Sequence, residues 1–586
     1  MKSQEKLAEE CLGMADLARE ALAWLDLPAN AETVGPAKKS LTQLLRRSSR
    51  RAWRLGRAAR TKMSVSVFGP SQAGKSFLVS VLARPKDGRL VADFAGPGGT
   101  LDYISEINPE GEGESTGLVT RFTMTRSATP EGFPIRLTLL SEADIARTLI
   151  NSFYMDGDES EPAPEPEDLS AHIETYRGRA GAEAPGMSAE ETLEIGEYVS
   201  GTFGRGAYAA ALRPFWEEAA AIAPRLGPAD RAGFLAILWG GHAALTELYA
   251  RLAAGLAQLG HPEEVFAPLA ALVPRESSII DVKTLHGLGQ PSADPGLPLR
   301  SPSGVTATLP RPLVCALAAE LVLPMKQEPS PIFGRTDLLD FPGARNRFKQ
   351  PLAKTLADPT APVTELLLRG KVAYLFDRYV ENQEITSMLL CVPDSNMDTI
   401  DLPRLVESWI ELTHGGRPEK RALTDCVLFF VMTKFDKHLG ESAAGGGDAS
   451  RFERRVFASL LEKFRAKDGW VEQWTPGRPF QNCYWLRNPN YFVEGLIDYD
   501  ANRREVSIRA SKADRLAELR AGCLEAPNVQ RHFRDPAAAW DAAMVMNDGG
   551  VGYLVGELAK VCSPDSKLRQ IQAQADKIAQ DIVAAL

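Results

Sequence analysis

A short loop between a strand pattern and a helix pattern constrains this chain more than any other feature. Residues 69–76 read GPSQAGKS, which matches the spacing GxxxxGK[ST]. The β-branched run at 63–67 leads into this loop, and the apolar helical run at 77–83 follows it. Glycine at 69 and 74 lets the backbone bend around phosphates, and the amides of residues 71–76 then point inward beside a helix N-terminus. The pattern predicts a nucleotide phosphate site.

Individual residues of this loop have expected roles at the nucleotide. We expect Lys75 to contact the β- and γ-phosphates and Ser76 to supply a hydroxyl to Mg²⁺. The residues predicted to bind the nucleotide here are Gly69, Ala73, Gly74, Lys75, Ser76 and Phe77.

A second strand pattern ends in an acid. Residues 338–343 read LLDFPG, so Asp340 follows an apolar run and Gly343 completes a DxxG spacing. We expect the Asp340 carboxylate to reach Mg²⁺ through water and the Gly343 amide to sense the γ-phosphate. Alone this signal is weak, because an Asp before a Pro-Gly turn is common. Its place after a strand, in a chain that already holds a phosphate loop, strengthens it.

A third strand pattern, at 427–432, leads into the base-reading signal Thr433-Lys434-Phe435-Asp436. This fits the pattern [NT]KxD. The Asp436 carboxylate is expected to accept hydrogen bonds from the guanine N1–H and exocyclic amine, a donor pair that adenine lacks. The alternative is an ordinary polar turn after a strand. The order of the three motifs, each at a strand's carboxyl end, favours a ligand site at that edge of an α/β sheet.

Two further segments complete the predicted site. A switch threonine should lie between the first two motifs, and the segment ESTGLVTR at 114–121 holds the candidates. Thr120 is the first choice as ligand of Mg²⁺ and γ-phosphate, and Thr116 is the second. For the loop that packs on the base we expect Leu486-Arg487-Asn488, after the last strand pattern.

The fold class predicted is α/β, with a mostly parallel sheet core of the nucleotide-binding type and helical segments before, inside and after it. Ser141, followed by Glu142 and Asp144, predicts a helix start. The acidic stretch 156–168 and the Pro/Gly/Ser-rich stretch 290–312 are expected to be loops or linkers. The strand candidates are 63–67, 118–126, 135–140, 337–340, 387–392, 425–432 and 483–486. The predicted segments are 1–62 (helical), 63–145 (core, first half), 146–325 (mostly helical insertion), 326–495 (core, second half) and 496–586 (helical).

Composition bounds the compartment and the partners. Seven scattered cysteines without a CxxC pair fit reduced thiols, and the N-terminus has no apolar signal region, so we expect a cytoplasmic protein. The net charge of −9 argues against wholesale nucleic-acid binding.

One basic helix, at about 41–60, is the exception to the acidic total. It fits either an anionic partner, with peripheral contact to an anionic membrane through 46–62, or a solvated face that pairs with acidic neighbours. Its basic residues are Arg46, Arg47, Arg50, Arg51, Arg54, Arg57, Arg60 and Lys62.

Helical spacing also marks both ends of the chain. Apolar residues recur at alternating steps of four and three from Leu7 to Leu25, and again at steps of three and four from Leu568 to Ala585. We expect these terminal helices to contact a protein partner or a second copy of the chain.

These motifs resemble the translation-factor-related GTPase superfamily, and within it the dynamin-like branch. GLVTR at 117–121 resembles the dynamin segment GIVTR, and DFPG at 340–343 resembles DLPG. The resemblance implies GTP or GDP with Mg²⁺ as cofactors and GTP hydrolysis as the activity. The dynamin loop reads GGQSAGKS where this chain has GPSQAGKS, so either Ser71 or Gln72, or neither, orients the attacking water. Ala344 follows Gly343, so there is no Ras-like glutamine, and the resemblance implies slow hydrolysis without a partner or self-association.

Over most of residues 60–560 the chain also resembles a bacterial virulence-factor family of the SrfC-like type. The matching stretches are FGPSQAGKSFLVSVLAR at 68–84, AELVLPM at 319–325, which we expect to be helical, and FDRYVENQEITSMLLCVP at 376–393. This resemblance implies a bacterial origin and an operon partner more than an activity.

Three functional hypotheses remain open. The first is a large multidomain GTPase that acts as a switch or as a self-assembling mechanoenzyme. The second is an assembly scaffold that binds nucleotide with little turnover, which the missing glutamine favours. The third is an ATPase on the same core.

Overall fold

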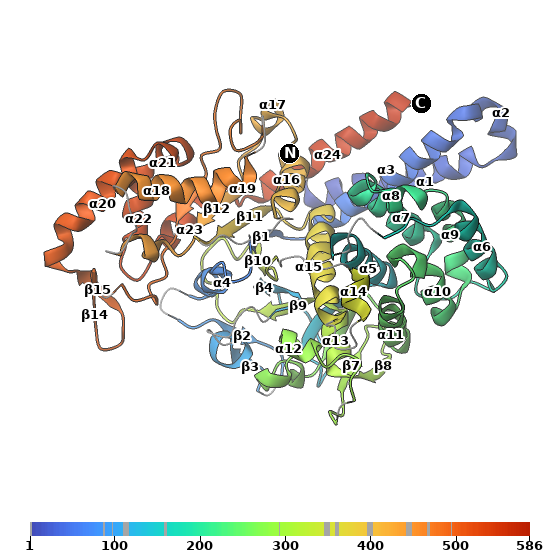
Figure 1. Cartoon of the computed structure of the whole chain (residues 1–586), viewed down its shortest axis with the longest axis horizontal. Coiled ribbons are helices and arrows are strands. Elements are labelled where there is room, and N and C mark those ends of the chain that lie inside the picture. The colour runs from blue at the N-terminus through green and yellow to red at the C-terminus, as the bar shows by residue number, and fades with distance from the viewer. Residues whose placement is uncertain are drawn as a thin grey trace.

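The computed structural model of the chain (Figure 1) describes residues 3–85, 88–96, 98–108, 116–156, 161–291, 293–344, 352–357, 363–394, 402–440, 448–465, 469–493 and 495–585. A large sheet occupies the middle, and helices surround it (Figure 1). The helices between residues 166 and 235 lie toward one end of the long axis, and those between residues 513 and 543 lie toward the other (Figure 1).

Within the described residues, eleven strands form this sheet. Its first five strands are parallel. Every residue of these strands is buried, as expected for strands covered on both faces. In spatial order the strands are β13 (Cys483–Trp485), β12 (Leu428–Met432), β11 (Ser387–Val392), β1 (Met63–Phe68), β10 (Thr336–Asp340), β4 (Val119–Thr123), β9 (Ala318–Pro324), β5 (Ile135–Leu139), β6 (Glu264–Ala267), β7 (Leu297–Arg300) and β8 (Thr306–Leu309).

The second half of the sheet is mixed. β4 runs antiparallel to β10 and parallel to β9, and the pairs from β9 through β8 are antiparallel. The α/β class and the predicted strands are confirmed, with shorter limits at β4 and β12. All three motif-bearing strands, β1, β10 and β12, belong to the parallel half.

Two expectations about local structure were wrong. Residues 319–325 are not helical, because β9 covers Ala318–Pro324 between β4 and β5. Pairing on both sides outweighs the helix propensity of Ala, Glu and Leu. The stretch 290–312 is not simply a linker, since it contains the hairpin β7–β8, whose apolar residues alternate inward. β6, β7 and β8 belong to the same sheet as β1, β10 and β12. The division of the chain into five segments stays a prediction.

Two long helices cover the middle of the sheet. α5 (Glu142–Asp156) begins after Ser141 as predicted, where the Asp144 amide donates to Ser141 Oγ (3.1 Å) and the Ser141 amide donates to Asp144 Oδ2 (3.0 Å). α15 (Val363–Glu381) packs closely on α5, because a Cβ at Gly370 would collide with the Thr148 carbonyl oxygen.

Further helices lie between β5 and β11 in the sequence. They are α6 (Pro166–Arg177), α7 (Ala189–Phe203), α8 (Ala207–Ala211), α9 (Phe215–Ile222), α10 (Pro228–Leu235), α11 (Ala243–Leu259), α12 (Val282–Leu285), α13 (Arg311–Leu317) and α14 (Leu352–Ala357).

The two ends of the chain meet in a helical bundle. α1 (Gln4–Leu25), α3 (Lys38–Arg60) and α24 (Pro564–Ala585) share one apolar cluster that includes Leu7, Leu55 and Ile571 (Figure 1). Lys567 Nζ also donates to the carbonyl oxygens of Thr61 (2.9 Å) and Lys62 (3.0 Å), just before β1. The predicted terminal stripes therefore pack mainly on each other.

The remaining elements surround the phosphate loop and the C-terminal part. α4 (Lys75–Ala83) follows the loop. A hairpin of β14 (Ile497–Tyr499) and β15 (Glu505–Ile508) opens the segment that was expected to be helical. None of the described helices is long and apolar enough to cross a bilayer. Others are α2 (Ala31–Val34), β2 (Val91–Asp93), β3 (Thr100–Asp102), α16 (Leu402–Thr413), α17 (Pro418–Arg421), α18 (Asp448–Val456), α19 (Glu462–Phe464), α20 (Ala513–Glu525), α21 (Pro527–His532), α22 (Pro536–Ala543) and α23 (Val551–Val561).

Candidate functional site

The loop at 69–76 wraps the space between β1 and α4. Gly74 has φ 82° and Gln72 has φ 59°, both in the left-handed region. A Cβ at Gly69 would collide with the carbonyl oxygen of Cys391 on the neighbouring strand. The turn therefore requires glycine where the sequence has it. Ser76 is exposed at the start of α4, and Ser71 is half-buried.

The side chain of Lys75 lies inside this loop. It is 6% exposed, and its Nζ donates to the carbonyl oxygens of Gly69 (3.2 Å) and Pro70 (2.8 Å). The ammonium is thus held where the loop closes, at the centre of the turn on which phosphates would rest.

The DFPG segment runs beside the loop. Asp340 ends β10 and pairs in register with Val67 of β1. Beyond it, the Ala344 amide donates to the Gly69 carbonyl (3.2 Å), and the Ser71 amide donates to the Ala344 carbonyl (3.3 Å). Gly343 is buried one residue earlier. The first two motifs are therefore joined by backbone hydrogen bonds.

Thr120 lies opposite Asp340. It lies inside β4, within the strand expected at 118–126, and pairs in register with Asp340. Its hydroxyl is buried and has no hydrogen-bond partner among the described residues. Thr116 instead forms an isolated bridge with Asp281, and residues 114 and 115 lie outside the described residues.

The base-reading motif contacts the phosphate loop directly. Thr433 Oγ1 donates to the Ala73 carbonyl oxygen (2.6 Å). Next to this bond lies a cavity of about 300 Å³, within the range of small-molecule sites. Its lining residues come from three separate stretches and are Gly74, Phe77, Thr433, Lys434, Asp436, Lys437, Leu486, Arg487, Asn488 and Tyr491.

Asp436 is the one carboxylate among the residues that line this cavity. Its Oδ2 accepts the backbone N–H of Asn488 (2.8 Å), and its Oδ1 lies 3.5 Å from Arg487 Nη1. Burial raises the pKa of Asp436 to about 6, against the lowering effect of the Asn488 amide and of Arg487. The group is still ionised at neutral pH and remains an acceptor.

Arg487 lies at the predicted place, but its guanidinium is already occupied. The side chain is fully buried, pairs with both carboxylate oxygens of Glu505 (2.7 and 3.1 Å), and donates from Nε to the Ala543 carbonyl (2.7 Å). It holds Asp436 and the loop in place, and Asn488 contributes its backbone amide.

Residues 21–586 match the sequence family described as "Putative bacterial virulence factor". The chain belongs to this family. No curated protein matches it.

In this family member, sequence reasoning missed two side chains of the cavity and one behind it. Tyr491 and Lys437 line the cavity, and Glu505 holds Arg487 from the hairpin β14–β15. Lys437 lies one residue after the TKxD motif, and Tyr491 follows the expected base loop by three residues, so a longer window around both motifs would have included them. Glu505 carries no local signal.

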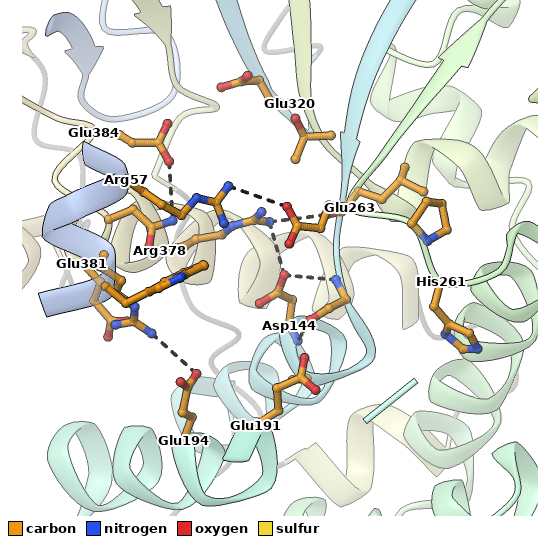
Figure 2. A pocket seen from close by; sticks show the side chains of 18 of the residues that line it. Arg57, Asp144, Glu191, Glu194, His261, Glu263, Glu320, Arg378, Glu381 and Glu384 are labelled. Atoms are coloured by element: carbon orange, nitrogen blue, oxygen red, sulfur yellow. Dashed lines mark hydrogen bonds and ion pairs between the residues drawn. The ribbon is translucent and has the colours of Figure 1, made fainter. Parts of the chain in front are cut away.

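A larger cavity, of about 1,340 Å³, lies at the other edge of the sheet (Figure 2). Lys62, Asp337 and Glu384 line it where β1, β10 and β11 begin. α3 forms one wall, and α5, α15 and the start of α7 contribute to the others.

The basic residues of α3 meet acidic ones across this cavity. Arg54 pairs with Glu381 (2.7 Å) and Glu194 (3.5 Å), and Arg57 pairs with Glu263 (3.6 Å) (Figure 2). Arg50 pairs with Glu194 and Glu197, and Arg60 pairs with Glu5 of α1 (2.5 Å). These contacts fit the alternative of a helix face paired with acidic neighbours. Membrane contact through 46–62 stays a prediction.

Proposed function

We propose that this family member binds GTP and hydrolyses it with Mg²⁺. The observation that carries the proposal is the shared cavity: residues of the phosphate loop, of TKFD and of the loop after β13 line one space of about 300 Å³. These segments are separated by more than 400 residues of sequence, and the parallel strands β1, β12 and β13 bring them to one edge of the sheet, where open α/β sheets bind their ligands.

The residues present fit a guanine nucleotide with its metal. Asp436 offers an ionised acceptor in a mainly apolar cavity, which suits a ring edge carrying two donors. Thr120 brings a buried hydroxyl without a partner among the described residues, opposite the register position of Asp340. Ser76, Thr120 and Asp340 would hold Mg²⁺, which neutralises phosphate charge when bound.

The chain's own groups would then act by binding and positioning. Lys75, now on two loop carbonyls, would turn its donors to the β- and γ-phosphates. The Gly343 amide would sense the γ-phosphate, and Thr433 would keep the base-reading strand against the loop. Ser71 and Gln72 are the two candidates to orient an attacking water, and Ala344 stands where a Ras-like protein has glutamine. Turnover is therefore expected to be slow for the isolated chain.

The dynamin-like resemblance and the terminal bundle extend this proposal to architecture. α1, α3 and α24 bring both chain ends together beside β1. The packing of a bundle in this place would change with the conformation of the switch segments. The protein would then act in a virulence-associated system, with a protein partner or a second copy of the chain. This step rests on analogy.

A nucleotide panel tests the proposal. Isothermal titration of the full chain with GTP, GDP, ATP and XTP, with and without Mg²⁺, should show binding of GTP and GDP and Mg²⁺-dependent tightening for GTP. Lys75→Ala should abolish the heat, and a matched Lys567→Ala variant, altered in the bundle, should keep it. Equal binding of ATP would overturn the guanine assignment in favour of the ATPase.

Ala344 favours a second candidate, a nucleotide-binding scaffold with little turnover. Phosphate release at high protein concentration separates it from the GTPase. Release no faster than that of Lys75→Ala would leave the scaffold.

A further inference from the structure

A buried carboxylate from the C-terminal segment lies behind the base-reading site. Glu505 is the first residue of β15, and its side chain is fully buried. Its two carboxylate oxygens accept Arg487 Nη1 (2.7 Å) and Nη2 (3.1 Å). Arg487 Nη1 is at the same time 3.5 Å from Asp436 Oδ1. One guanidinium is therefore shared between two carboxylates, and the bidentate contact belongs to Glu505.

Glu505 is itself fixed by a second segment. The backbone N–H of Asn547 donates to Glu505 Oε2 (2.8 Å), and the backbone N–H of Glu505 donates to Asn547 Oδ1 (2.9 Å). The side-chain Nδ2 of Asn547 donates to the backbone carbonyl oxygen of Glu505 (2.8 Å). The Arg487 amide donates to the Gly549 carbonyl (2.9 Å) in the same turn. Residues 505, 547 and 549, which follow the last strand of the large sheet in the sequence, therefore fix the position of Arg487.

The charge balance explains why this matters for Asp436. With Glu505 in place, Arg487 is paired, and Asp436 keeps acceptor capacity for a ligand. Without the Glu505 charge, the buried guanidinium would have Asp436 as its remaining anionic partner. Among the described residues, other charged or titratable groups near Asp436 are Lys434, Lys437 and Tyr491 on the cavity wall and Tyr499 of β14.

We propose that Glu505 is a positioning residue: it holds Arg487 away from full pairing with Asp436 and so sets the affinity for the guanine ring. This inference rests on the proposed function and adds a determinant of specificity from the C-terminal segment.

The test compares the affinity of a fluorescent GDP analogue with Mg²⁺ across about pH 5 to pH 8, the range in which a carboxyl with a raised pKa titrates. Glu505→Gln should weaken binding at neutral pH by about tenfold, because the released Arg487 pairs with Asp436 and takes up the acceptor capacity that the guanine ring needs. The midpoint of its pH profile should move to lower pH, because the unpaired arginine favours ionised Asp436.

Three variants make the result specific. The double variant Glu505→Gln with Arg487→Met removes both charges and should recover affinity relative to Glu505→Gln alone. Glu505→Asp keeps the negative charge and should retain the wild-type midpoint of the pH profile. This variant also allows the test if Glu505→Gln does not fold. Glu142→Gln breaks an equally buried ion pair, between Glu142 and Arg231 (2.7 Å), which does not line the smaller cavity. This variant should change thermal stability without changing the affinity for GDP.

The outcomes separate the two proposals. If the wild type binds GDP but Glu505→Gln keeps both its affinity and its midpoint, the inference is wrong and the proposed function stands. Weaker binding with an unmoved midpoint, and no recovery in the double variant, would reduce Glu505 to a structural role and also overturn the inference. A wild type that binds no nucleotide would overturn the proposed function itself.

Discussion

The two cavities at opposite edges of the sheet differ in how their charges are used. The smaller has one carboxylate in its lining, Asp436, and its other charged lining residues are the basic Lys434, Lys437 and Arg487. The larger is lined by many charges of both signs, which pair with each other: Arg121 meets Glu320, Asp337 and Glu384 at 2.6–3.2 Å. Charge density is therefore a poor guide to a ligand site. A single acceptor with spare capacity is more informative than a large network whose members satisfy one another.

This difference also explains the basic helix. Read alone, the run from Arg46 to Lys62 suggests an anionic partner. In the folded chain three of its arginines, Arg50, Arg54 and Arg57, pair with Glu194, Glu381 and Glu263, which come from other parts of the sequence. The helix therefore contributes basic side chains to the ion pairs that join the bundle to the rest of the fold.

The largest expected effect tests whether the charges of the larger cavity are structural. Arg121→Met leaves three mostly buried carboxylates without their shared cation, so the free energy of unfolding should fall by about 3–5 kcal/mol. The loss should shrink as pH falls, because the unpaired carboxylates take up protons in the folded state. Chemical denaturation monitored by circular dichroism at two pH values measures both.

The matched control is Arg57→Met, whose partner Glu263 is 81% exposed, so its cost should stay below about 1 kcal/mol. If Arg121→Met left stability intact but abolished binding of GDP, the division between a structural and a ligand-binding cavity would be wrong.

The next effect concerns the smaller cavity. Asp436→Asn replaces one acceptor by a donor, so the preference should move from guanine to xanthine nucleotides by about a hundredfold, while thermal stability changes little. Competition between GDP and XDP for a fluorescent analogue measures the shift. Asp144→Asn, in the larger cavity, is the control and should keep the guanine preference. An Asp436→Asn variant with unchanged preference would remove base reading from this cavity.

The smallest effect is a pH dependence. Because burial raises the pKa of Asp436 to about 6, the carboxyl loses its charge as the pH falls through that value. A protonated carboxyl cannot accept both guanine hydrogen bonds, so GDP affinity should fall by about tenfold for each pH unit below about pH 6. The control is the pH profile of the residual GDP binding by Asp436→Asn. This variant has no carboxyl at position 436, so its profile reports the protonation of the nucleotide phosphates. Identical pH profiles for the two proteins would show that Asp436 does not titrate at the bound base.

The motifs could be found in the sequence because they are local. Gly69, Gly74 and Lys75 occur in one turn between a β-branched strand and an apolar helix, and the strands β11 and β12 are mainly apolar runs that a short sequence window detects. Their common edge followed from one rule about parallel sheets. β9 was missed because AELVLP favours a helix until neighbours on both sides pair with it.

The sequence by itself determined the glycine-containing turn at 69–76, the acids at or shortly after the ends of two strands and the amphipathic faces of the terminal helices, since each depends on residues within a few positions of one another. The tertiary structure alone decided which charges meet. Glu505 reaches Arg487, Glu381 reaches Arg54, and Glu384 reaches Arg121 across 18, 327 and 263 residues. Coulomb energy depends on distance in space and on burial, and neither is encoded in spacing along the chain.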